Sequence, residues 1–314
     1  MNKVFAFLVV FGMGLTAHAE LYKLEGTPFQ PATNTEIVWL VTTPNLPKNL
    51  WVYKVIPQSF PMAVLSNLLN LCELKSVNMT KPANFPVSDK HGIRFATYSP
   101  SGTTIRSLDI APNNGWIDYH NNSDATIRKG VAPTNEIVRE LALDILHQMG
   151  IDSSLVSLKG YSEGTTKHDT NQPFISKRSI SFFRKIEGLN EVGYCFYAKY
   201  TTHDKEPLLL DFELNWRNLL PHKSFRVATV GEINEFILSG KATIPPQNID
   251  LNALKLATKY TVTTFFPVYY GQPAFKQIDF EFPFAAVDIV ADCPEGKTLS
   301  FTMYCPILAT DTSR

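Results

Sequence analysis

The stretch 206–240 constrains the fold most, because it combines a strand pattern with a helix whose two ends are marked. Every second residue of 208–214 is apolar, which is the period of a strand that packs one face on a core. Thr229 and Glu232 then form a capping-box pattern, and Gly240 ends the apolar helical stripe that follows. We expect a strand, a turn and a capped helix.

A related order of elements occurs earlier, over 93–150. Strand patterns separated by turn residues predict an antiparallel meander. After Pro133, Thr134 is placed to cap a helix that ends at Gly150. The apolar residues of this helix recur every four positions, at Ile137, Leu141, Ile145 and Met149. The two stretches together predict an α+β fold of two related halves, each an antiparallel sheet covered by a helix.

The predicted boundaries follow from this repeat. Residues 1–19 form a signal peptide, 20–159 an N-terminal α+β half, and 174–314 a C-terminal α+β half with a β-rich extension. Between the halves, 160–173 lacks apolar periodicity and is predicted to be a linker loop. A further helix after Ser59 is expected to bury Leu65, Leu68, Leu69 and Cys72.

The signal peptide is predicted from three features of 1–19. Lys3 precedes an apolar run over 4–15, and Ala17 and Ala19 are small residues at the positions that signal peptidase recognises. The run is shorter than the roughly 20 residues that a membrane-spanning helix needs. We therefore expect a secreted or periplasmic protein with no membrane span after signal cleavage.

Charge composition limits the partners. The 314 residues include 29 basic and 29 acidic side chains, so the net charge is zero. Nucleic acids and anionic membrane surfaces attract clustered excess lysine and arginine, and no such cluster occurs. We expect no nucleic-acid partner.

The cysteines leave two interpretations open. Their even number in an exported chain permits disulfides, with more than one connectivity. A hairpin of 284–293 with 298–305 would separate its two cysteines by more than the roughly 7 Å between Cα atoms that a disulfide spans. Buried free thiols are the alternative. The candidate disulfide cysteines are Cys72, Cys195, Cys293 and Cys305.

Ser162 is the one candidate nucleophile. Residues 160–164 match the G-x-S-x-G motif, in which a sharp strand-to-helix turn exposes a serine beside oxyanion donors. No helical pattern follows the motif. His168 and Asp169 are too close in sequence to be the usual separated triad partners, although His203 or His222 could serve. A secreted serine hydrolase using Ser162 is therefore an alternative function.

Other motifs for chemistry are missing from the sequence. The histidines and cysteines show no H-x-H, H-x-x-x-H or paired C-x-x-C spacing, so we predict no metal site and no cofactor. Asp118, Tyr119 and His120 group an acid, a phenol and an imidazole, but adjacent strand residues point to opposite faces. Asn78 and Asn121 begin sequons that matter only if the host glycosylates secreted proteins.

Several segments resemble the secreted or membrane-tethered PepSY and YycI-like regulatory proteins. The resemblance spans 90–300 and implies tandem, cystatin-like α+β units that act without catalysis, by binding envelope peptidases or sensor kinases. It implies no catalytic residues. The membrane anchor usual in those families is missing here, which weighs against a kinase partner. The segments are Phe182–Val192, the acidic strand to Asn215-Trp216, the helix 230–239 and Phe266–Tyr270 for the second half, and Ser101-Gly102 through Gly150 for the first.

These observations predict an exported, non-catalytic binding or regulatory protein. Its partner would be a protein or peptide in the envelope or extracellular space that adds to a sheet face or edge. A structural secreted protein without a discrete ligand is a further alternative. In the predicted repeat, the polar strand face of 206–240 is the first place to look for the partner.

Overall fold

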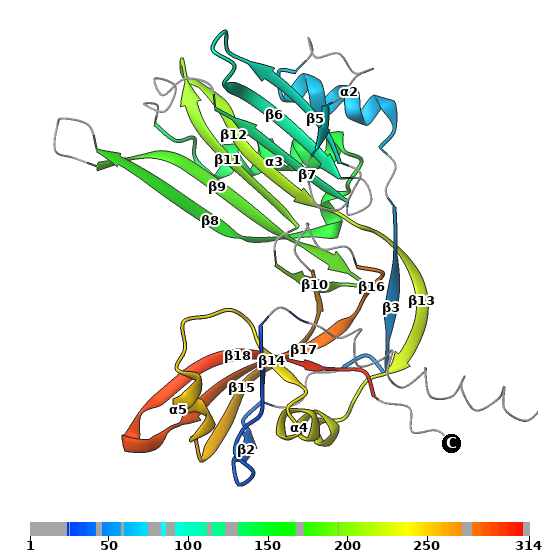
Figure 1. Cartoon of the computed structure of the whole chain (residues 1–314), viewed down its shortest axis with the longest axis vertical. Helices are drawn as coiled ribbons and strands as arrows, with labels where there is room; N and C mark the ends of the chain where they lie inside the picture. Colours follow the sequence, from blue (N-terminus) through cyan, green and yellow to red (C-terminus); the bar gives the residue numbers. More distant parts are fainter. Residues whose placement is uncertain are drawn as a thin grey trace, which may run out of the picture. The chain divides into compact units, whose positions relative to one another are not determined.

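The computed structural model describes residues 24, 26–41, 46–57, 60–74, 83–85, 92–111, 115–122, 131–167, 173–193, 195–271 and 278–309. The predicted signal peptide and Asn78 lie outside them. Strands dominate the described part, which contains eighteen strands and four α-helices (Figure 1). The predicted α+β fold, with one helix-covered sheet in each half, is therefore wrong, because the protein is mostly β-sheet. No helix in the described residues is long and apolar enough to span a membrane.

The chain folds into two compact units that interleave along the sequence. Unit 1 comprises 1–54, 221–272 and 280–314, and unit 2 comprises 55–220 and 273–279. The chain passes from one unit to the other within strands β3 (Asn49–Ile56) and β13 (Asn218–Arg226). The units are thus not consecutive stretches, unlike the predicted halves 20–159 and 174–314.

Unit 2 is built on one antiparallel sheet, the unit 2 sheet. Its strand order is β8-β9-β11-β12-β7-β6-β5-β4, and β10 (Leu189–Val192) pairs with β9 as well. The strands are β8 (Val156–Lys167), β9 (Pro173–Ile186), β11 (Phe196–His203), β12 (Glu206–Asn215), β7 (Trp116–Asn121), β6 (Thr104–Ala111), β5 (Gly92–Tyr98) and β4 (Ala83–Phe85).

The pairing of β7 with β12 explains why two separate halves do not form. Ile117 lies opposite Leu214, and Tyr119 lies opposite Phe212. The meander of the predicted first half and the strands of the predicted second half therefore belong to one sheet. The first part of the predicted linker loop, 160–167, is not a loop but lies in strand β8.

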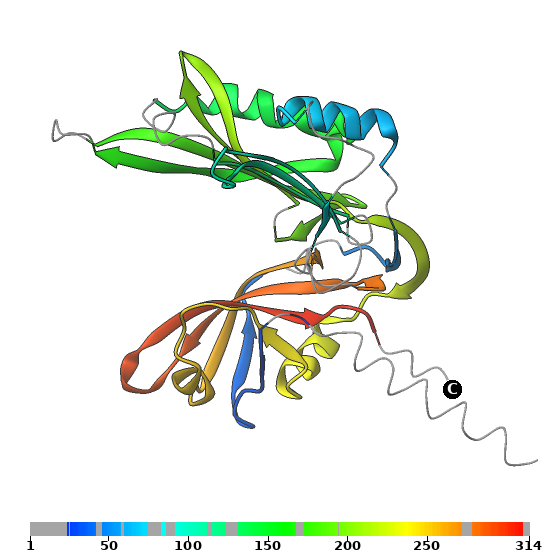
Figure 2. The ribbon, with the colours of Figure 1, turned by 45° about the horizontal axis from the view of Figure 1, so that its top comes forward.

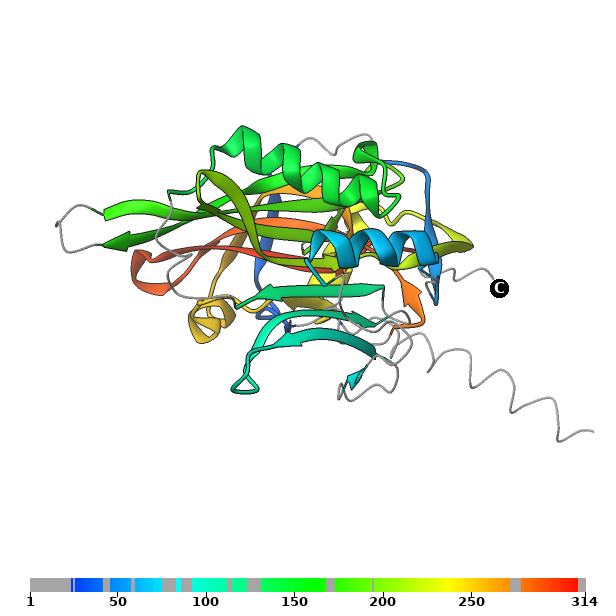
Figure 3. The same ribbon diagram turned by 90° about the horizontal axis from the view of Figure 1, so that it is seen from above.

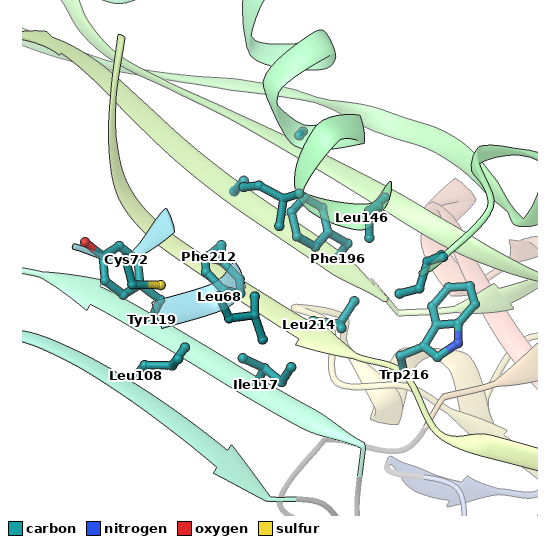
Figure 4. Packing of buried hydrophobic residues seen from close by; sticks show 14 of the residues in the cluster. Leu68, Cys72, Leu108, Ile117, Tyr119, Leu146, Phe196, Phe212, Leu214 and Trp216 are labelled. Carbon is teal, nitrogen blue, oxygen red and sulfur yellow. The ribbon is translucent and has the colours of Figure 1, made fainter. Parts of the chain in front are cut away.

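Two helices cover one face of the unit 2 sheet, α2 (Met62–Leu71) and α3 (Asn135–Gln148), as Figures 2 and 3 show. The Thr134 side chain accepts a hydrogen bond from the amide of Ile137, which confirms the predicted cap. Between helices and sheet lies the core of the unit (Figure 4). Its members include Leu68, Leu108, Ile117, Tyr119, Leu146, Phe196, Phe212 and Leu214.

The apolar helix faces were predicted with unequal success. Leu68, Leu69 and Cys72 are buried, and Leu65 packs partly buried against the same core, as the pattern after Ser59 indicated. In α3 the predicted stripe is offset. The buried residues are Val138, Ala142, Ile145 and Leu146, whereas Ile137 is 39% exposed.

Unit 1 contains a second sheet, in the order β1-β14-β18-β17-β15, with β2 parallel to β15. Helix α4 (Val230–Leu238) packs against β18. Thr229 and Glu232 form the predicted capping box of α4. A small sheet joins β13, β3 and β16 (Phe280–Glu281), and α5 spans Leu251–Lys255. The remaining strands are β1 (Thr27–Phe29), β2 (Glu36–Trp39), β14 (Ala242–Ile244), β15 (Lys259–Tyr270), β17 (Pro283–Asp292) and β18 (Thr298–Pro306).

Candidate functional site

Ser162 does not lie on a nucleophile elbow. It is an exposed residue inside β8, opposite Ser179, and the two side-chain oxygens are 2.7 Å apart. A serine hydroxyl is not a base that could activate Ser162, and the strand-to-helix turn of the motif is missing. Of the candidate partners, His203 lies beside Asp204 in the β11–β12 turn, and His222 packs on the ring of Phe280.

His168 and Asp169, which the sequence made unsuitable as separated triad partners, lie outside the described residues. Asn121, the second sequon, is buried, and its amide nitrogen donates to the carbonyl of Leu209. A glycan could not be attached there without opening the sheet.

The cysteines are free thiols in the structure, and all are buried. Burial raises the pKa of the Cys72, Cys195 and Cys305 thiols far above the ordinary value. Because only the thiolate is a nucleophile or a metal ligand, these side chains serve packing. Among the described residues, no group of three or more His, Cys, Asp or Glu is arranged to hold a metal ion.

Charged residues line the face of the unit 2 sheet that is opposite its helices, which we call the polar face. They alternate along each strand with core residues such as Phe95, Leu108, Tyr119 and Phe212. The cross-strand register places Asp118 opposite Asp109 on one side and opposite Glu213 on the other. The polar face consists of Arg94, Asp109, Asp118, His120, Lys199, Asp211 and Glu213.

His120 is the centre of this face. Its Nε2 lies 2.8 Å from Asp118 Oδ2, and its Nδ1 lies 3.2 Å from Asp211 Oδ1. Hydrogen bonds to Asp118 and then to Asp211 raise the pKa of His120 to about 10, so the imidazole is charged at neutral pH. Lys199 Nζ lies 2.6 Å from the other carboxylate oxygen of Asp211. Burial alone would raise the pKa of Asp211, but the hydrogen bonds from His120 and Lys199 outweigh it and lower that pKa.

The rest of the polar face is paired in the same way. Arg94 holds Asp109 with two hydrogen bonds, of 2.6 and 2.9 Å, and the Asp109 side chain is only 2% exposed. Trp116 Nε1 donates to Glu213 over 3.2 Å. Because its charged groups already satisfy one another, the polar face holds the sheet together and offers a partner little unpaired charge.

The edge of this sheet at β8 is more accessible to a partner than the polar face. In the described part of the chain β8 pairs with β9 alone, from Val156 opposite Arg184 to Lys167 opposite Pro173. The pairing of β9 with β11 covers only Arg178–Phe182, so the β8–β9 ribbon runs on past the sheet (Figure 1). The outer side of β8, which we call the β8 edge, therefore faces no other strand of the described residues.

Comparison with known proteins adds little. No protein-family model matches the chain, and no curated protein matches it. A solved structure of an uncharacterized protein from Eubacterium rectale is similar with a TM-score of 0.45 and 9% identity, over 86% of this chain and 86% of that one. A likeness this low supports no argument about fold or function. The PepSY and YycI-like resemblance stays a prediction.

Proposed function

We propose that this chain is an exported binding protein that holds an extended segment of a protein or peptide against the β8 edge. The single observation that carries the proposal is that β8, twelve residues long, pairs on one side only in the described part of the chain. An added strand would gain backbone hydrogen bonds along this edge, which is how many peptide-binding domains recognise extended ligands.

The side chains of β8 support an accessible edge. Proteins commonly protect an edge strand with lysine side chains that extend into solvent. Here Lys159 folds back, with Nζ 3.2 Å from the carbonyl of Gly193 and 5.2 Å from the centroid of the Phe183 ring. Glu163 is held by Arg178 of the neighbouring strand over 2.8 Å.

No bulky side chain fills the space at Gly160, between Lys159 and Glu163 along β8. Gly160 has no side chain, and a Cβ placed there would meet no atom within 4 Å. Leu158, at 43% exposure, offers an apolar contact next to the backbone groups. Backbone hydrogen bonds would give such a site affinity for any extended chain, and contacts with residues such as Leu158 would give it selectivity.

Paired lysine substitutions test the edge. The Leu158→Lys, Thr165→Lys double variant should keep its fold, because both residues are exposed, yet resist strand addition. Proteins captured from envelope extract by the mature protein should be lost with this variant. On binding of a captured partner to the wild type, hydrogen exchange of the β8 amides should slow at least tenfold.

The matched control carries the same number of added lysines in unit 1, at Leu40 and Leu256, which are 70% and 65% exposed. The Leu40→Lys, Leu256→Lys protein should capture the same partners as the wild type. Equal capture by both double variants, or partner binding without protection of β8, would show that the edge is not the binding site.

A further inference from the structure

A small cavity lies on the helix side of unit 2, away from the polar face. Its volume is about 180 Å³, and it opens between the end of α2, helix α3 and the strands β7, β11 and β12. Leu141, Ile145 and Leu209 give it apolar walls, and Tyr119 and Tyr200 are among its other lining residues. An apolar cavity of about 150 Å³ is large enough for benzene, so this one can take a ligand of similar or slightly larger size.

The Tyr200 hydroxyl is the unexplained group in this cavity. Tyr200 is 3% exposed, and its hydroxyl oxygen has no hydrogen-bond partner among the described residues. An unsatisfied buried hydroxyl costs about 1–3 kcal/mol, so proteins seldom keep one without a ligand or water to complete it. Burial also raises the pKa of Tyr200, which keeps the hydroxyl neutral and able both to donate and to accept a hydrogen bond.

Two acidic side chains, Glu73 and Asp144, line the cavity. Glu73 lines it but forms an ion pair of 2.7 Å with Arg106. Asp144, exposed on α3, also lines the cavity, and its carboxylate accepts a hydrogen bond of 2.6 Å from the neutral amide of Gln148. Among the described residues Asp144 has no ion-pair partner. A negative charge that has no ion-pair partner among the described residues thus lies at a partly apolar cavity that is also lined by Tyr200, whose hydroxyl is unsatisfied.

We propose that this cavity binds a small organic ammonium ion of about six to eight non-hydrogen atoms in total. The apolar part would lie against Leu141, Ile145 and Leu209. The ammonium group would donate to the Tyr200 hydroxyl and face the Asp144 carboxylate, with the tyrosine rings adding a cation–π attraction. The proposal does not depend on the β8 edge, because none of these residues belongs to β8 or β9.

Titration with three matched probes tests the charge preference. n-Pentylammonium, n-pentanol and pentanoate share one apolar chain and differ in the charge of the end group. Amide NMR shifts of the full mature chain should report millimolar binding of n-pentylammonium at residues that line the cavity, at least fivefold tighter than n-pentanol. Pentanoate should not bind.

Two variants connect this preference to the named residues. Asp144→Asn should bring n-pentylammonium and n-pentanol to equal affinity, and Tyr200→Phe should weaken both by about threefold to tenfold. Glu140→Gln, on the same helix and exposed, and Tyr161→Phe, a partly buried tyrosine outside the cavity, are the controls and should leave binding within twofold.

Other results would overturn the proposal. Binding of n-pentanol as tight as that of n-pentylammonium in the wild type would show that no cation is preferred. Shifts that map away from the cavity, or no shifts at all, would show that the cavity takes no such ligand. If Tyr200→Phe does not fold, Leu141→Phe replaces it: filling the cavity should abolish binding, and unchanged binding would contradict the assigned site.

Discussion

At the scale of single residues, the polar face shows what strand alternation can predict. Tyr119 points into the core, as its position between two residues of opposite orientation indicated. Asp118 and His120 are two positions apart and therefore share a face, where they form an ion pair. Asp211, the second partner of His120, is 91 residues away in the sequence. No local pattern identifies such a partner, because it depends on which strands become neighbours.

The His120 pairing predicts a stability that falls in alkali. The histidine has an ordinary pKa near 6.5 when unfolded, and about 10 when folded. Its stabilising contribution is complete below pH 6.5, where both states are protonated, and is lost as the pH rises towards 10. The side chain is 47% exposed, so solvent screening limits the effect to about 1 kcal/mol. Urea unfolding at pH 6 and pH 9.5 measures it.

The His120→Gln variant isolates this contribution, because it removes the titrating group. The part of the stability loss between pH 6 and pH 9.5 that comes from His120 should disappear in this variant. An identical pH slope in the wild type and His120→Gln would contradict the assignment. Asp211 acts in the opposite direction: its lowered pKa adds stability that is present above about pH 4 and is lost in acid.

At the scale of elements, local sequence signals predicted where helices begin better than which helix face is buried. The caps Thr134 and Thr229 are confirmed, because a cap depends on residues three positions apart. The stripe predicted for α3 used a period of four residues, whereas the helix turns once in 3.6, so each step drifts by about 40°. Over the three steps from Ile137 to Met149, this drift leaves Ile137 exposed, whereas Ile145 is buried and Leu141 and Met149 pack partly buried against the core.

The α4 cap provides a test at this scale. The Thr229 side chain accepts from the amide of Glu232, and Glu232 accepts from the backbone N–H of Thr229 over 2.7 Å. Thr229→Ala removes one half of this box and should lower the free energy of unfolding by about 1 kcal/mol. Thr229→Ser keeps the hydroxyl and should stay within about 0.5 kcal/mol of the wild type. Urea unfolding compares the two, and equal losses would show that the hydroxyl does not stabilise α4.

At the scale of the whole molecule, the sequence predicted strands but not their partners. Thr27 of β1 pairs with Ile244 of β14, and Trp116 of β7 pairs with Asn215 of β12. Alternation shows that one face of a strand is buried, but the backbone groups that join strands are the same in every sequence. The same pattern of alternating residues is therefore consistent with two interleaved units and with two consecutive halves. The predicted repeat assumed two consecutive halves, which is wrong.

The thiols test the fold of both units together, since Cys72 and Cys195 belong to unit 2 and Cys293 and Cys305 to unit 1. Burial raises the pKa of all four thiols and keeps them from solvent. Such buried thiols can stay reduced even in an oxidising compartment, because disulfide exchange needs an accessible thiolate. A thiol reagent such as DTNB should therefore react slowly with the native protein.

The same reagent distinguishes free thiols from the disulfides that the sequence left open. In denaturant without reductant, four thiols should react, the number that the structure places as free. Two reacting thiols would show one disulfide, and none would show two. Fast reaction of a native thiol would locate a part of the core that opens, and peptide mapping of the labelled cysteine would assign it to unit 1 or unit 2. If all four thiols react slowly in the native protein and all four react after unfolding, both cores are stabilised by packing without a disulfide.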